Sequence, residues 1–282
     1  MLIDTHSFET MKTSMKQYLN IDDGVLADFF RLAEKKCTQG IFCDGDILSN
    51  DIDEFIGNHV GASSIERVMF FHLSRRLNSA NSDYSGTNLF DILTTKNALS
   101  NFLESHNISF IPNGKHLIIL FNGKTVSIED TFIDGVCYLR SRLGYNEGRE
   151  DYCFNGFAFK DLLYKNSYAR SLYEAPELIQ QLSSFLHYPS LLNDFAENSR
   201  YYCLEYIVPL DIVLFDDIDD LPQTEKSKYF LNQVMTRLYE YATSDPRYLS
   251  DNANPILRLA DDGTMKEEYF VDKEEITLDM LR

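Results

Sequence analysis

The sequence predicts an α+β fold, with an antiparallel-rich sheet that follows a helical N-terminal region and has helices inserted between its strands. Three patterns support this prediction. Apolar residues show helical spacing before residue 60, Asn-Gly turns separate short strand-like segments at 108–128, and apolar residues occupy alternate positions at 203–215. We therefore expect a helical region over residues 1–60 and an α+β core over residues 61–282, with a helical insertion at about 160–200.

The first 60 residues show the periodicity of amphipathic helices. Apolar residues recur at the spacing of one helix face at Val25, Phe29, Leu32 and Ala33. A second helix is expected to begin near Ser49 or Asn50, because either side chain can cap free backbone amides. Residues 43–46, Cys-Asp-Gly-Asp, lack the remaining ligands of a calcium-binding loop, so we expect a capped turn there.

Residues 62–78 fit two different structures. Ser63 and Glu66 form the capping-box pattern of a helix start, and the apolar residues that follow keep helical spacing. The short apolar run Val68–Leu73 also suits a buried strand. The local pattern favours a helix here, and a further helix is expected over Asn88–Leu103.

The rest of the chain alternates between strand and helix patterns. The segment 108–128 predicts a meander of three strands, because Asn-Gly tolerates the positive φ angles of tight hairpin turns. Pro176 and Pro189 mark helix starts within the insertion. Beyond it we expect a strand, an amphipathic helix and a last strand, at Cys203–Phe215, Lys226–Thr243 and Glu267–Val271. Pro209 places the first of these strands at a sheet edge or gives it a bulge.

The composition excludes several classes of protein. The 282 residues include 26 basic and 44 acidic side chains, and a formal net charge of −18 argues against broad wrapping of nucleic acid. A hydrophobic share of 44% excludes wholesale disorder. The N-terminus lacks the apolar core of a signal peptide, and no apolar run approaches the ~20 residues that span a bilayer, so we expect a soluble, cytoplasmic protein. The five cysteines and six histidines show no zinc-binding spacing, so no metal site is expected.

Three patches of sequence carry a more specific signal. An aromatic-His-x-Ser pattern lies in Phe70–Leu77, a strand-like segment with Val-Pro lies in Glu205–Leu214, and Glu-Tyr-Phe-Val lies in Lys266–Ile276. Their order resembles ADP-ribosyltransferase-like folds, in particular the DarT-like and RNA 2′-phosphotransferase-like branches. The resemblance covers short patches with long unmatched stretches between them. It implies that Val68–Leu73 is a strand close to Glu268, against the local helix pattern.

The resemblance also implies roles for named residues, with NAD as the substrate. Glu268 would supply the catalytic carboxylate, because cleavage of the nicotinamide–ribose bond builds positive charge on the ribose. His72 and Ser74 would hold a ribose or the nicotinamide amide through hydrogen bonds. The candidates for the guanidinium that binds the pyrophosphate are Arg75, Arg76 and Arg149. A polar, glycine-containing loop at 144–152 adds Arg149 as a second catalytic candidate and two aromatic residues for stacking, Tyr145 and Tyr152.

Two classes of function follow from these patterns. The first is an NAD-dependent ADP-ribosyltransferase-like enzyme of the toxin or phage-conflict kind, whose acceptor is a protein or small molecule in preference to nucleic acid because the chain is so acidic. The alternative is a non-catalytic acidic interaction protein, such as an inhibitor or immunity protein that masks a basic partner surface. A concave site lined by His72, an arginine and Glu268 would favour the enzyme.

Overall fold

A computed structural model describes residues 1–39, 42–59, 64–80, 84–128, 135–148, 150–216, 218, 221–251 and 253–282. The fold is α+β, as predicted, with helices and antiparallel sheets. The chain divides into two compact units. Unit 1 comprises Met1–Phe71, Phe157–Asn166 and Ile207–Leu257, and unit 2 comprises His72–Gly156, Ser167–Tyr206 and Arg258–Arg282. The division at residue 60 stays a sequence-based prediction.

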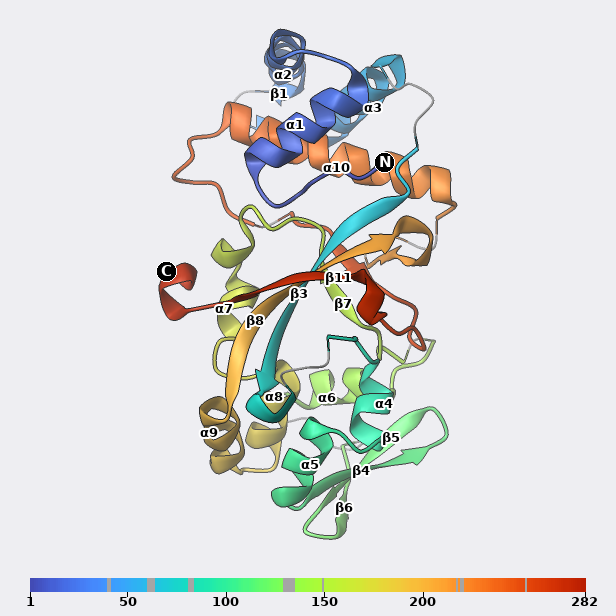
Figure 1. The fold of residues 1–282 in the computed structure, drawn as a ribbon, viewed down its shortest axis with the longest axis vertical. Helices are drawn as coiled ribbons and strands as arrows, with labels where there is room; N and C mark the ends of the chain where they lie inside the picture. The colour runs from blue at the N-terminus through green and yellow to red at the C-terminus, as the bar shows by residue number, and fades with distance from the viewer. Residues whose placement is uncertain are drawn as a thin grey trace. The chain divides into compact units, whose positions relative to one another are not determined.

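Four helices form much of unit 1 (Figure 1). The helices α1 (Phe8–Leu19), α2 (Asp23–Cys37) and α3 (Gly45–His59) pack against α10 (Gln223–Thr243). Two short strands, β1 (Thr38–Gln39) and β2 (Phe42–Cys43), join α2 to α3, and a 3₁₀ turn, η2 (Leu163–Lys165), also belongs to this unit. Asp44 begins α3, because its Oδ1 accepts hydrogen bonds from the amides of Asp46 and Ile47 at 3.1 and 3.2 Å. The capped turn expected at 43–46 is therefore confirmed, and α3 starts before the predicted position.

The buried face of α2 differs from the predicted face. Its buried residues are Leu26, Phe30, Ala33 and Cys37. Val25 and Leu32, which were expected on the apolar face, are 40% and 51% exposed. Both sets have helical spacing, so periodicity alone could not choose between two adjacent stripes of one helix.

One sheet has the strand order β11-β8-β3-β7-β10-β9. Its strands are β3 (Arg67–Leu77), β7 (Asn155–Phe157), β8 (Ser199–Pro209), β9 (Leu214–Phe215), β10 (Ile256–Arg258) and β11 (Phe270–Glu275). The pair β3–β7 is antiparallel, with Phe71 opposite Phe157, and so is the pair β11–β8, with Phe270 opposite Tyr206. The division of the chain into units falls within β3, after Phe71, and within β8, after Tyr206.

Residues 67–77 form a strand, so the helix that the local pattern favoured is wrong. Val68, Met69, Phe70 and Phe71 are all buried. A strand covered on both faces lacks the alternation of apolar and polar residues that marks a half-exposed strand. Ser63, the expected start of the helix, lies outside the described residues.

Two other predicted strands have different ends. The strand expected at 203–215 begins at Ser199 and stops at Pro209, where a 3₁₀ turn, η3 (Leu210–Ile212), separates it from β9. The last strand was expected to include Glu267 and Glu268. These residues instead lie in a 3₁₀ turn, η4 (Glu267–Tyr269), and β11 begins at Phe270.

Unit 2 packs a three-stranded meander against helices. The meander is β4 (Ile108–Asn113), β5 (His116–Phe121) and β6 (Lys124–Val126), and its second turn has positive φ at Asn122 and Gly123, as the sequence predicted. The helices and 3₁₀ turns of this unit are α4 (Leu89–Thr94), α5 (Ala98–Ser105), α6 (Val136–Arg142), α7 (Ser167–Ser171), α8 (Glu177–Phe185), α9 (Pro189–Glu197), η1 (Asn78–Ala80), η4 and η5 (Leu278–Leu281). The single helix expected at 88–103 is two helices, because Asn97 caps a second start.

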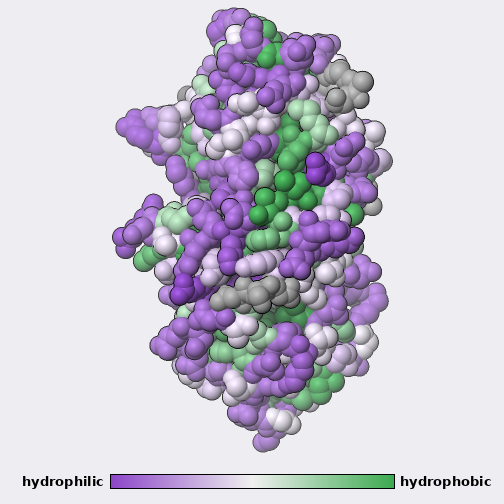
Figure 2. Space-filling model, in the orientation of Figure 1, coloured by the Kyte–Doolittle hydropathy of each residue, from purple (hydrophilic) through white to green (hydrophobic). Residues whose placement is uncertain are grey.

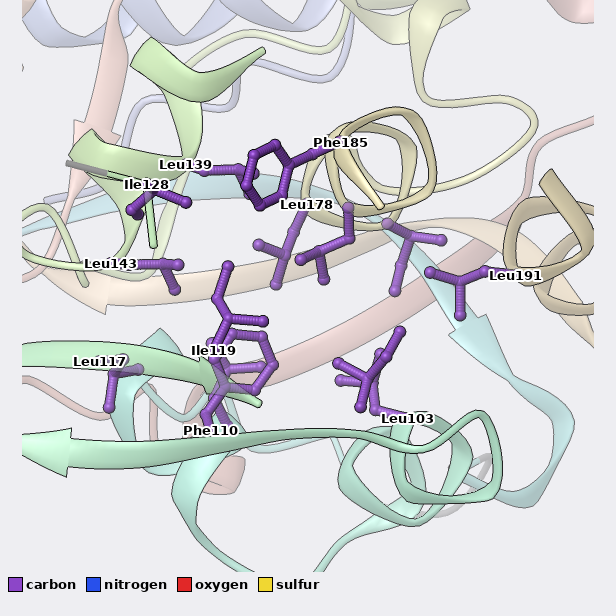
Figure 3. Packing of buried hydrophobic residues seen from close by; sticks show 14 of the residues in the cluster. Leu103, Phe110, Leu117, Ile119, Ile128, Leu139, Leu143, Leu178, Phe185 and Leu191 are labelled. Carbon is purple, nitrogen blue, oxygen red and sulfur yellow. The ribbon is translucent and has the colours of Figure 1, made fainter. Parts of the chain in front are cut away.

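The core of unit 2 lies between the meander and these helices. Figure 3 shows side chains of β4 and β5, such as Phe110 and Ile119, directed toward those of α6 and α8, such as Leu139 and Phe185. On the face of the molecule drawn in Figure 2, hydrophilic residues predominate. Within the described part of the chain, no helix combines the length and the apolar character needed to cross a membrane.

Candidate functional site

Strand β3 divides the predicted site residues between the two faces of the sheet. Because side chains alternate along a strand, His72, Ser74 and Arg76 share one face and Arg75 lies on the other. His72, Ser74 and Arg76 are all partly exposed. The aromatic-His-x-Ser pattern therefore places two of the predicted NAD-binding side chains and one guanidinium on the same side of unit 2.

Arg75 is held by one side-chain hydroxyl and two backbone carbonyls. Its Nε donates to Ser199 Oγ at 2.8 Å, its Nη2 donates to the Ala196 carbonyl at 2.8 Å, and its Nη1 donates to the Tyr173 carbonyl. The guanidinium carbon lies 5.6 Å from the centre of the Tyr173 ring. Ala196 is in the last turn of α9, where a cation also meets the negative end of the helix dipole. These contacts give Arg75 a structural role in joining β3 to α9.

His72 is fixed in orientation and is neutral at pH 7. Its Nδ1 donates to the Asn155 carbonyl at 2.6 Å, because a carbonyl can only accept. Burial lowers the pKa of His72 to about 4, and the charge of Arg76 acts in the same direction. With its proton on Nδ1, the neutral ring presents Nε2 as a hydrogen-bond acceptor.

Five rings extend from His72 across the sheet, and we call this set the aromatic row: His72, Phe154, Tyr206, Phe270 and Tyr84. Successive ring centres are 4.1 Å apart for His72 and Phe154, 6.0 Å for Phe154 and Tyr206, and 5.8 Å for Tyr206 and Phe270. Phe270 and Tyr84 are stacked at 4.2 Å with an interplanar angle of 9°. The Tyr206 hydroxyl donates to the Tyr84 carbonyl at 2.8 Å, which fixes Tyr84 beside β8.

Two cations lie near the aromatic row. Lys273 Nζ donates to the Tyr84 hydroxyl at 2.8 Å and lies 5.0 Å from the Tyr84 ring centre and 5.3 Å from that of Tyr202. The hydrogen bond to Tyr84 raises the pKa of Lys273, while the nearby charge of Arg76 opposes this shift. Because Arg76 perturbs both His72 and Lys273, the two cations and the imidazole belong to one electrostatic environment.

Glu268, the predicted catalytic carboxylate, stands two residues before Phe270. Its side chain is 66% exposed, and its Oε1 lies 3.3 Å from Lys266 Nζ. Since η4 is a 3₁₀ turn, the strand alternation expected to direct Glu267 and Glu268 to opposite faces does not apply. An exposed carboxylate with a single surface ion pair can readily change rotamer.

The loop at 144–152 lies in a different environment. Tyr152 is buried in the core of unit 2, where its hydroxyl donates to the Lys115 carbonyl at 3.0 Å and its ring meets Phe90 edge-on at 5.3 Å. The ring centres of Tyr145 and of His116 in β5 are 4.6 Å apart. Tyr152 thus belongs to the core of unit 2 and Tyr145 packs against it, while Arg149 lies outside the described residues.

The sequence did not identify most of the aromatic row. Tyr206, Phe270 and Lys273 lie within the patches Glu205–Leu214 and Lys266–Ile276 but had no role assigned to them there, and Tyr84 and Phe154 lie outside all three patches. Comparison with known proteins adds no assignment, since no protein family, curated protein or solved structure matches the chain. Among the described residues, no group of three or more His, Cys, Asp and Glu side chains could hold a metal ion.

Proposed function

We propose that unit 2 binds NAD on the face of β3 that carries His72, and that the chain is an ADP-ribosyltransferase-like enzyme. One observation carries the proposal. A neutral histidine, an aromatic row and two cations lie on one side of a single sheet, in a chain of net charge −18. The acceptor that we propose is a protein or a small molecule, and because NAD is abundant inside cells, the proposed place of action is the cytoplasm.

The groups on this face match the parts of a dinucleotide. Arg76 can bind pyrophosphate oxygens in a bidentate manner, and Lys273 adds a second positive charge. His72 Nε2 can accept a hydrogen bond from a ribose hydroxyl, and Ser74 can donate one. The partly exposed ring of Tyr84, already stacked on Phe270, offers a surface on which a base can stack.

In the proposed reaction, the bond between nicotinamide and C1′ of the ribose breaks, and nicotinamide leaves as a neutral molecule with the bonding electron pair. A nucleophilic atom of the acceptor bonds to C1′ and loses its proton. The ribose carries positive charge in between, and Glu268, turned from Lys266, would stabilise it. The Glu268 side chain is 66% exposed just before β11, so its carboxylate is accessible to a ligand.

The first experiment separates binding from chemistry. NAD binding to the wild-type chain is measured by isothermal titration calorimetry, and nicotinamide release is followed by chromatography with candidate protein and small-molecule acceptors. Arg76→Gln should weaken NAD binding. Glu268→Gln should leave binding unchanged but slow nicotinamide release by about 10²–10³-fold, because it removes one preorganised charge.

Glu267→Gln is the matched control, since Glu267 is an exposed carboxylate in the same 3₁₀ turn. It should retain full turnover, and circular dichroism should show the same folded spectrum for all variants. Equal activity of the two glutamate variants would show that Glu268 is not the catalytic carboxylate. A wild-type chain that neither binds NAD nor releases nicotinamide would refute the proposed function.

A further inference from the structure

Two cysteines of unit 1 share one tyrosine hydroxyl. Cys37 is the last residue of α2, and Cys43 is the last residue of β2. Cys37 Sγ lies 3.3 Å from Tyr239 Oη, and the Tyr239 hydroxyl is 3.8 Å from Cys43 Sγ. Cys37 is buried, whereas Cys43 is exposed. Both thiols therefore converge on one atom of α10, and one of them can be reached from solvent.

The backbone places the same two residues at neighbouring positions of the β1–β2 pair. In the β1–β2 pair, Thr38 stands opposite Cys43, and the amide of Asp44 donates to the Cys37 carbonyl at 2.8 Å. Cys37 is the sequence neighbour of Thr38, the residue opposite Cys43. Two residues placed in this way lie about 6 Å apart between their Cα atoms, which is inside the range found in disulfides. Both sulfur atoms also lie within 3.8 Å of the Tyr239 hydroxyl oxygen, so the two side chains converge on one point.

We propose that Cys37 and Cys43 are a disulfide-forming pair whose oxidant is a small disulfide such as oxidised glutathione. The exposed Cys43 loses its proton and attacks one sulfur of oxidised glutathione, whose S–S bond breaks to release one glutathione thiol. Cys37 then loses its proton and attacks Cys43 Sγ in the mixed disulfide, releasing a second glutathione thiol. The two protein thiols are oxidised, one glutathione disulfide is reduced to two thiols, and the two protons end on the two glutathiones.

The surroundings of the pair set the rate of this exchange. Burial raises the pKa of Cys43 to about 11, the neighbouring Cys37 thiol adds to the shift, and the charge of Asp44 acts in the same direction, while the Tyr239 hydroxyl opposes it. Only the thiolate attacks a disulfide, so the exchange is slow at neutral pH and quickens about tenfold per pH unit below the pKa.

The product would tie the end of α2 to the start of α3. Asp44, which follows Cys43, caps α3, and both helices pack against α10. Oxidation would therefore close a short loop across the connection between two core helices of unit 1, and the oxidised chain should unfold at a higher temperature than the reduced chain.

Mass spectrometry tests the pairing directly. The full chain is incubated with oxidised glutathione at pH 7 and pH 9, free thiols are alkylated, and the chain is digested with trypsin. No Lys or Arg lies between Cys37 and Arg67, so both cysteines fall in one peptide. The expected product is that peptide with two hydrogens lost and no alkyl groups, formed faster at pH 9. Cys43→Ser should abolish it, and Cys137→Ser, which removes an exposed cysteine of unit 2, should not.

Three results would overturn the proposal. One is a stable glutathione adduct on Cys43 with Cys37 still alkylated. Another is a disulfide that joins either residue to a different cysteine. The third is a peptide that keeps both thiols after prolonged incubation at pH 9, with circular dichroism showing that the chain is folded.

Discussion

Replacement of Arg237 by methionine is expected to destabilise unit 1 strongly. The Arg237 side chain is 1% exposed, and its Nη2 lies 2.7 Å from Asp251 Oδ1. Asp161 Oδ2 lies 4.0 Å from Nη1, and Glu240 Oε2 lies 3.8 Å from Nε. The guanidinium carbon is 5.5 Å from the Phe159 ring centre. Asp251 and Asp161 are themselves 0% and 1% exposed, so one buried cation faces two buried carboxylates.

The loss of stability on removal of this cation can be estimated. Methionine is apolar, so it leaves the carboxylates of Asp251 and Asp161 buried without a positive charge. Breaking a buried ion pair by deleting one partner costs about 3–5 kcal/mol of the free energy of unfolding. In the variant, Asp251 Oδ2 still accepts hydrogen bonds from the side-chain amides of Asn166 and Asn254, at 3.2 and 3.0 Å. Asp161 keeps one from the Tyr241 hydroxyl, but its Oδ1 has no partner among the residues that the structure describes.

The cost should depend on pH. Burial raises the pKa of Asp161 above its usual value, and Arg237 opposes that shift. The folded state then binds more protons than the unfolded state. The stabilising contribution of protonated Asp161 is therefore present at low pH and is lost as the pH rises through the pKa of Asp161 in the folded state. Without Arg237 the pKa rises further. The loss of stability in the variant should therefore be smaller at pH 5 than at pH 8.

Urea unfolding followed by circular dichroism measures these effects. The matched control is Arg247→Met, because Arg247 is 79% exposed and pairs with Asp245 on the surface, and its unfolding midpoint should not change. A second substitution, Asp251→Asn, should restore part of the stability lost in Arg237→Met, because it removes an uncompensated charge. Equal midpoints for the two methionine variants, or no recovery in the double variant, would refute this reasoning.

Two further predictions concern Gly86 and His72 of unit 2, with Gly57 of unit 1 and His187 of unit 2 as the comparison positions. Gly86→Ala should cost about 1–3 kcal/mol, because its Cβ would lie 2.4 Å from the Phe154 ring. Gly57 of α3 has open space around its Cα, so Gly57→Ala should raise the free energy of unfolding by about 0.5–1 kcal/mol. Thermal melts in which both variants match the parent would contradict these two predictions. Stability should fall by up to about 3 kcal/mol as the pH drops from 6.5 to 4, because the unfolded chain protonates His72 first. His72→Asn should remove this slope, and His187→Asn, at an exposed position, should keep it. An unchanged slope in the former would be inconsistent with a His72 ring that stays neutral in the folded chain.

Features encoded by neighbouring residues could be predicted from the sequence. The meander is one example, since Asn122 and Gly123 themselves adopt the positive φ that the turn requires. The capped turn at 43–46 is another, because Asp44 bonds amides only two and three residues away. Whether residues 67–77 form a strand or a helix depends on distant parts of the chain. Burial on both faces comes from other strands and helices, and it removes the alternation that a local pattern needs.

The candidate site shows the same limit. Alternation along β3 was sufficient to group His72 with Arg76 once the strand was known. The stacking of Tyr84 on Phe270 joins residues far apart in sequence, and no local signal marks Tyr84. Arg75 looked equivalent to Arg76 in the sequence, yet the carbonyl groups that surround it lie more than 95 residues away. Only the fold could separate the two arginines.

The order of the segments in unit 1 has a consequence for synthesis on the ribosome. Helices α1, α2 and α3 leave the ribosome first, but α10, against which they pack, begins only at Gln223. At typical rates of translation, roughly 10–30 s pass between the end of α3 and the start of α10. During that interval Phe30, whose ring meets that of Tyr239 in α10, lacks this contact. We therefore expect the nascent chain to expose apolar surface to chaperones, and shortening the delay should raise the yield of folded protein.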